Sequence, residues 1–154
     1  MIIKELEANR AIANNDKLKA AFVQFEKLLF ELRKRELPDG IVASINNEID
    51  KLNSVEGLPG EFKKALKKSK ASVLKVLEKE AKLVPKKYYR NLWLSLGTGI
   101  FGIPIGFIVA KGAKNMALIG VGMPIGSLIG AAVGERKDRK ALAQGRQLDV
   151  DIWY

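Results

Sequence analysis

The chain of 154 residues contains neither cysteine nor histidine. The lack of cysteine excludes disulfide bonds and thiolate nucleophiles. The lack of both residue types excludes the usual zinc ligands and acid–base catalysis by histidine. No motif in the sequence places two carboxylates together or a nucleophile beside a base. We therefore expect a protein that is not an enzyme and that uses neither a metal nor a cofactor.

Acidic residues are also missing between Arg90 and Glu135, where Lys111 and Lys114 are the only charged side chains. The same stretch holds ten of the fourteen glycines. The rest of the chain is rich in charge of both signs, and the formal net charge of the whole is +10. This change of composition near Arg90 predicts a boundary between two parts of the protein.

Residues 1–84 are predicted to form an amphipathic helical bundle or hairpin, and strand signals are missing throughout the chain. Apolar residues recur there at spacings of three and four, which places them on one face of a helix. Pro38 predicts that the first helix ends near Glu36, and Pro85 limits the third. The apolar positions are Leu18, Phe22, Phe25, Leu29 and Leu32, then Ile41, Ile45, Ile49 and Leu52, then Phe62, Leu66, Val73, Leu77 and Ala81.

The third predicted helix carries a row of lysines, and three interpretations remain open for it. The row is first of all typical of a solvated face whose opposite side packs on the first two helices. A basic amphipathic helix also suits an anionic membrane surface. Contact with nucleic acid through Lys63, Lys64, Lys67, Lys68 and Lys70 is the least favoured, because Phe62 is the only aromatic side chain available for stacking.

Two uncharged stretches, Leu92–Ala110 and Met116–Val133, are long enough to cross a bilayer. As helices they would span about 27–29 Å, against a hydrocarbon thickness of about 30 Å. Only the five residues Lys111–Asn115 separate them, so we expect an antiparallel transmembrane hairpin within residues 85–134. The alternative is a glycine-rich hairpin or strand pair buried in protein, but the chain has little other apolar surface to enclose it.

Glycines recur every four residues in both stretches, which places them along one stripe of each helix. A stripe without side chains allows two helix backbones to pack closely in lipid. The expected helix-packing residues are Gly102, Gly106, Gly122, Gly126, Gly130 and Gly134. Pro104 and Pro124 are expected to kink their helices. One interpretation is that the kinks form a hinge or a polar notch, as in broken transporter helices. The other is that the prolines have only a packing role, because proline is common in membrane helices.

Basic and aromatic residues flank the predicted hairpin and are expected to contact the membrane surface. They are Lys86, Lys87, Arg90 and Trp93 before it and Arg136, Lys137, Arg139 and Lys140 after it. The connecting loop has only two lysines, so the positive-inside rule predicts that both termini lie in the cytoplasm and the loop outside. The predicted location is the cytoplasmic (inner) membrane.

The segment Gly97–Gly102 matches the spacing G-x-G-x-x-G of dinucleotide-binding loops. Such a loop needs a strand before it, a helix after it and an acidic residue about 20 residues further on. No acidic residue occurs at that distance. We interpret the match as a consequence of glycine density, and no small-molecule substrate is expected.

Residues 135–154 are expected to form a charged tail that begins as a helical turn and ends at "QLDVDIWY", in which the role of Trp153 and Tyr154 stays open. The series "YYRNLWLSLG", "GIPIG", "GMPIG" and "GRQLD" resembles small bacterial glycine-zipper membrane proteins of uncharacterised function. The resemblance covers about residues 84–150. It implies membrane location and tight helix packing and brings no catalytic residues.

Two functional hypotheses follow. The first is a non-enzymatic membrane scaffold or interaction protein, anchored by the hairpin, whose partners are the lipid bilayer and a second copy or another membrane protein. The second is a homo-oligomeric pore or membrane-permeabilising protein, for which Ser95, Thr98 and Ser127 are the available polar groups. No nucleic-acid partner is expected in either case.

Overall fold

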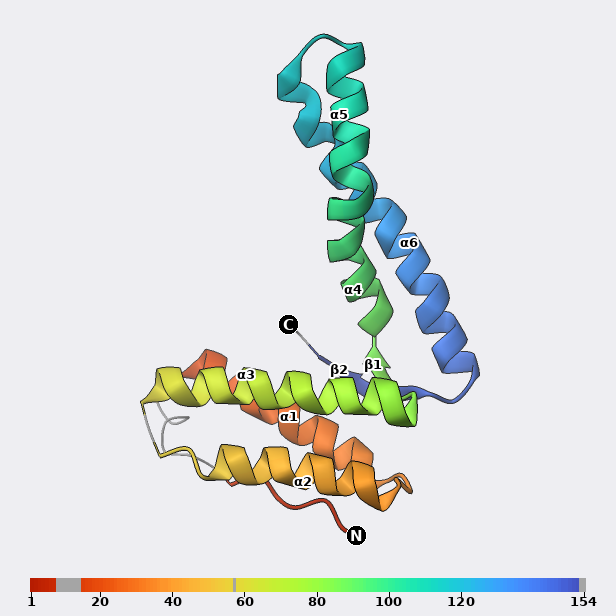
Figure 1. Cartoon of the computed structure of the whole chain (residues 1–154). Helices are drawn as coiled ribbons and strands as arrows, with labels where there is room; N and C mark the ends of the chain where they lie inside the picture. Colours follow the sequence, from red (N-terminus) through yellow and green to blue (C-terminus); the bar gives the residue numbers. More distant parts are fainter. Residues whose placement is uncertain (8–14, 57, 153–154) are drawn as a thin grey trace. The chain divides into compact units, whose positions relative to one another are not determined.

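Helices make up most of the chain that the structure describes, as the periodicity predicts (Figure 1). The computed structural model describes residues 1–7, 15–56 and 58–152. The chain divides into two compact units, one formed by Met1–Val84 with Leu148–Tyr154 and the other by Pro85–Gln147. The composition change near Arg90 therefore lies close to a boundary between units.

The first unit is built on the helices α1 (Asp16–Arg33), α2 (Asp39–Asn53) and α3 (Pro59–Val76), and a π-helical turn, Leu77–Ala81, continues α3. Asn15 fixes the start of α1, because its side chain accepts a hydrogen bond from the Leu18 N–H. The helix ends at Arg33 rather than near Glu36, since the next N–H, that of Lys34, already bonds to the Leu32 carbonyl in a tighter turn.

The predicted apolar faces of these helices form one core. Phe25, Leu32, Ile45 and Leu77 have no exposed surface. Each such side chain stabilises the fold by about 1.5–3 kcal/mol relative to its exposed state. Lys70 departs from the predicted lysine face, because only 7% of it is exposed and its Nζ donates to Gln24 Oε1 at 3.1 Å.

The described part of the carboxy-terminal segment is not a separate tail, which corrects the predicted domain of residues 135–154. Its first residues continue the long helix α6 (Gly122–Ala143), and its last described residues form the strand β2 (Gln147–Asp151). Leu148, Val150 and Ile152 alternate with exposed residues and are buried in the core of the first unit. The role left open for Trp153 and Tyr154 lies outside the described residues.

A two-stranded sheet pairs β2 with the short strand β1 (Val84–Lys86), although no strand was expected from the sequence. Three residues that include Pro85 are too few to show the alternation by which a strand is predicted. The sheet occurs where the chain enters and leaves the second unit.

The second unit consists of two long helical stretches. Tyr88–Gly112 contains α4 (Tyr88–Gly97), a π-helical segment (Thr98–Gly102) and α5 (Ile103–Gly112). Met116–Ala143 contains a 3₁₀ turn (Met116–Val121) and α6. Figure 1 shows the two stretches side by side and joined by a tight turn.

Candidate functional site

The two helical stretches of the second unit are long and apolar enough to cross a membrane. They contain 25 and 28 residues, and each includes a strongly apolar run of 18 residues. Only 17% of each run is buried. A core helix of a globular protein buries most of its apolar length, whereas these two stretches stay largely uncovered in the described part of the chain.

The exposed surface of the second unit carries large apolar side chains. Ile108 and Leu128 are 69% and 71% exposed, and many more of the same kind are exposed to at least a third. The latter include Ile100, Ile103, Phe107, Val121, Met123, Ile125 and Ile129. Monomeric soluble proteins rarely expose an apolar surface of this extent.

Glycines form the contact between the two helical stretches, and all six predicted packing glycines lie in it. A Cβ atom at Gly126 would lie 2.5 Å from the Gly97 carbonyl oxygen and 2.6 Å from the Gly102 Cα. A Cβ atom at Gly122 would lie 2.6 Å from the Gly106 Cα. No Cβ atom fits at such distances, so the two backbones approach as closely as only glycine allows.

The contact continues toward the start of α4. A Cβ atom at Gly130 would lie 2.8 Å from the Trp93 carbonyl carbon and 3.0 Å from the Gly97 Cα. A Cβ atom at Gly134 would lie 2.7 Å from the Arg90 backbone nitrogen. Four glycines of α6, spaced by four residues, thus face the other stretch over three helical turns.

Gly97 belongs to this contact, although the sequence analysis did not include it among the packing residues. It precedes Gly102 by five residues, which breaks the four-residue repeat. The π-helical segment Thr98–Gly102 takes up the additional residue and returns Gly102 to the same face. A five-residue interval next to a four-residue one is therefore the signal that would have identified Gly97.

The two prolines lie at starts of helical segments. Pro104 is the second residue of α5 and directly follows the π-helical segment. Pro124 is the third residue of α6 and follows the 3₁₀ turn. Proline has no N–H to donate in the first turn of a helix, and the irregular turn before each proline accommodates its ring.

Two hydroxyl groups meet across the glycine contact. Thr98 Oγ1 and Ser127 Oγ lie 2.6 Å apart. Each hydroxyl has one hydrogen, so one of the two donates to the other, while the second donates to a carbonyl one turn earlier in its own helix, that of Leu94 for Thr98 or that of Met123 for Ser127. Both hydroxyl groups thus have a hydrogen-bond partner inside the pair of helices.

Asp138 ties α6 to the start of α4, a role that the sequence did not indicate. Its two carboxylate oxygens accept hydrogen bonds from the backbone N–H groups of Tyr89 and Arg90, at 3.0 and 2.9 Å. The residue is 8% exposed. These N–H groups have no partner within their own helix, so the carboxylate acts as a helix cap supplied from another helix.

The predicted membrane-surface residues lie at the end of the second unit where α4 begins. Lys137 Nζ lies 4.9 Å from the centre of the Trp93 ring and 5.7 Å from that of Tyr89. Arg90 Nε lies 3.1 Å from Glu135 Oε1. Lys86 lies in β1, Lys87 precedes α4, and Arg136, Arg139 and Lys140 lie on α6. A pocket of about 400 Å³ there is lined by Lys86, Lys87, Arg90, Glu135, Asp138, Arg139, Leu142 and Gln147.

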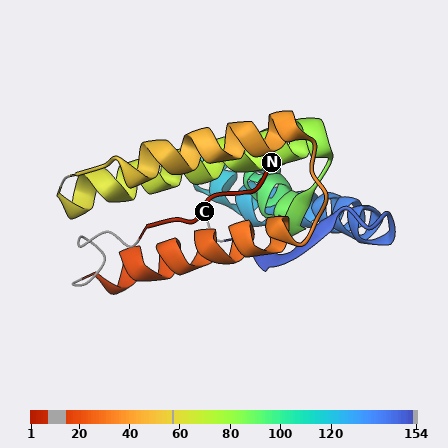
Figure 2. The same ribbon diagram turned by 90° about the horizontal axis from the view of Figure 1, so that it is seen from below.

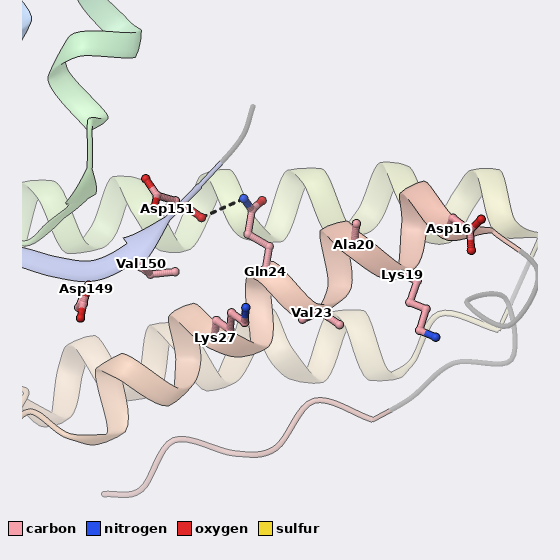
Figure 3. Close-up of a pocket in the computed structure, with 9 residues that line it drawn as sticks. All are labelled: Asp16, Lys19, Ala20, Val23, Gln24, Lys27, Asp149, Val150 and Asp151. Atoms are coloured by element: carbon pink, nitrogen blue, oxygen red, sulfur yellow. Dashed lines mark hydrogen bonds between the residues drawn. The ribbon is translucent and has the colours of Figure 1, made fainter.

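The segment Gly97–Gly102 is helical and lies in the glycine contact, so the structure does not place it in a strand-to-helix loop. A pocket of about 680 Å³ lies between α1 and β2 in the first unit (Figure 3). Lysines of α1 and aspartates of both elements line it, and Gln24 Nε2 donates to the Asp151 carbonyl at 2.9 Å. Among the described residues no three His, Cys, Asp or Glu side chains gather as a metal site would require.

Comparisons of the chain with protein-family models, with curated proteins and with solved structures found no match.

Proposed function

We propose that the protein is an integral membrane scaffold or interaction protein, anchored by a glycine-zipper hairpin. The glycine contact carries the proposal. In lipid, apolar side chains gain nothing by facing a neighbouring helix, and close backbone packing holds helices together instead. The second unit has this arrangement, with glycines between the helices and large apolar side chains outside.

The distribution of charge supports a location in the cytoplasmic membrane with both termini inside. Basic residues with nearby tyrosine and tryptophan rings gather at one end of the hairpin, while the connecting turn has only Lys111 and Lys114. Cytoplasmic flanks of membrane helices carry such an excess of lysine and arginine. The first unit would then lie in the cytoplasm, where its surface is available to partners.

The contacts favour the scaffold over the pore. A pore of several copies would need the glycine stripes or the hydroxyl groups at an interface between copies or along a lumen. The stripes of both helices are already used within one chain, and Thr98 and Ser127 bond to each other. The polar groups named for a pore lining are thus largely satisfied, so the hairpin is a better anchor than a channel.

Extraction and topology together test this function. The expressed protein is extracted from membranes with alkaline carbonate, and reporters are fused at each terminus and within Lys111–Asn115. We expect the protein to stay in the membrane, with both terminal reporters inside and the loop reporter outside. Release by carbonate would contradict the proposal, because the hairpin would then be covered by protein. Ion flux from reconstituted vesicles distinguishes a pore from a scaffold.

A further inference from the structure

The amino-terminal segment, residues 1–7, follows an irregular path between α1 and α2 (Figure 2). It inserts two apolar side chains, Ile3 and Leu6, which are 6% and 8% exposed. The residues beside them are exposed. The segment therefore lies in a groove of the first unit, and every third side chain points into the groove.

Two asparagines of α2 bind the backbone of the segment in the same way. Asn46 Nδ2 donates to the Ile2 carbonyl at 2.9 Å, and its Oδ1 accepts from the Lys4 N–H at 2.8 Å. Asn53 Nδ2 donates to the Glu5 carbonyl at 3.2 Å, and its Oδ1 accepts from the Glu7 N–H at 3.0 Å. Each amide thus holds the backbone on both sides of one inserted apolar residue.

The spacing of the two asparagines matches this path. Seven residues along a helix advance about 10.5 Å, and three residues of an extended chain advance about 10 Å. Asp50 lies between the asparagines on the same face of α2. Its carboxylate oxygens lie 2.7 and 2.8 Å from Lys4 Nζ. From α1, Arg33 donates to the Ile3 and Lys4 carbonyls at 3.2 and 2.6 Å.

Ile3 and Leu6 join the core of the first unit, but the backbone of the segment is held in the way in which a domain binds an extended peptide. Among the described residues, no backbone–backbone hydrogen bond joins the segment to another part of the chain. Side chains of α1 and α2 supply the partners for its backbone, as in domains that recognise extended peptides. A cavity of about 200 Å³ beside Leu6, lined also by Glu5, Glu26, Leu29 and Arg33, leaves the groove wider than its occupant.

We propose that the groove between α1 and α2 is a binding site for an extended peptide segment of a partner protein, with the pattern apolar–Lys–any–apolar. Ile3–Leu6 is its intramolecular ligand. The asparagines and Arg33 bind the backbone of any sequence, while the buried positions of Ile3 and Leu6 and the carboxylate of Asp50 select the pattern. A tethered ligand has an effective concentration in the millimolar range, so a partner segment must outcompete it to bind. The site belongs to the first unit and stands whether or not the hairpin spans a membrane.

A labelled hexapeptide with the sequence of residues 2–7, added to the full chain in detergent, tests the site by fluorescence anisotropy. The variant Ile3→Asp/Leu6→Asp removes the intramolecular ligand and leaves α1 and α2 unchanged. We expect this variant to bind the hexapeptide saturably, at least tenfold more tightly than the unaltered chain. Adding Asn46→Ala/Asn53→Ala should weaken binding at least tenfold, because four hydrogen bonds are lost. A hexapeptide with glutamate in place of its lysine should also bind more weakly.

Failure of the folded aspartate variant to bind, with its helical circular dichroism intact, would overturn the proposal. Equal binding after the asparagine substitutions would do the same. Hydrogen exchange of the unaltered chain covers the case in which the aspartate variant does not fold. Excess hexapeptide should accelerate exchange at the Lys4 and Glu7 amides, because displacement frees them from Asn46 and Asn53. Unchanged exchange at millimolar hexapeptide would exclude a displaceable segment.

Discussion

Replacement of Gly126 by alanine is the sharpest perturbation of the glycine contact. The added Cβ atom would lie 2.5–2.6 Å from backbone atoms of Gly97 and Gly102. Carbon atoms in contact lie about 3.5–4.0 Å apart, so the helices must separate by about 1 Å. A gap of that size removes a quarter to a half of the dispersion energy of each contact, and overpacking of this kind costs about 1–3 kcal/mol.

Gly99 provides the matched control, because a Cβ atom there meets nothing within 4 Å. Alanine at this position should stabilise the helix by about 0.5–1 kcal/mol, since glycine loses more chain entropy on folding. Unfolding in detergent by titration with sodium dodecyl sulfate, followed by tryptophan fluorescence and circular dichroism, measures both effects. Gly126→Leu should destabilise the second unit more than Gly126→Ala does. Stability of Gly126→Ala equal to that of Gly99→Ala would refute the reasoning.

Three further changes test other parts of the account. Asp138→Ala should destabilise the second unit by about 1–3 kcal/mol, because two N–H groups lose a charged acceptor, and it should accelerate amide exchange at the start of α4. Leu148→Ala should cost about 2–5 kcal/mol in thermal or denaturant unfolding, as for a core residue. The same change at Leu142, which is 62% exposed, should cost far less. Burial, together with nearby Lys67, lowers the pKa of Lys70 below its ordinary value of 10.5. Between the lowered pKa and 10.5 the unfolded chain binds more protons than the folded chain, so the free energy of unfolding rises with pH in this range. Lys70→Met should remove that rise in pH-dependent unfolding, and an unchanged rise would assign it to another group.

The sequence predicted the helices of residues 16–81 because their apolar residues recur with the period of a helix. It did not predict β1, since Val84-Pro85-Lys86 is too short to show a pattern. Leu148, Val150 and Ile152 do alternate, but only the folded chain shows which core receives them. The amino-terminal segment has no helical period. Only the fold shows that its two apolar residues, Ile3 and Leu6, are buried beside α2.

Within the candidate site, periodicity placed the glycines on helix faces but not against particular partners. Gly97 was missed because a π-helical segment, which depends on tertiary packing, restores its register. Asp138 was missed because a single acid within "ERKDRK" is typical of a solvated helix face. Its function depends on two N–H groups 48 and 49 residues earlier in the chain. Sequence patterns carry no information on such a pairing.

The most direct test of the membrane hairpin uses the absence of cysteine, which allows single cysteines to be introduced without background labelling. The positions are Lys114 in the turn, Ile103 on the apolar surface of α5 and Lys75 on α3. A membrane-impermeant maleimide is added to cells in which it reaches the outer face of an intact inner membrane. Lys114→Cys should react in these cells, and Lys75→Cys should react only after the cells are lysed. Ile103→Cys should react only after the membrane is dissolved. Reaction of Ile103→Cys in intact membranes as fast as that of Lys114→Cys would contradict the account.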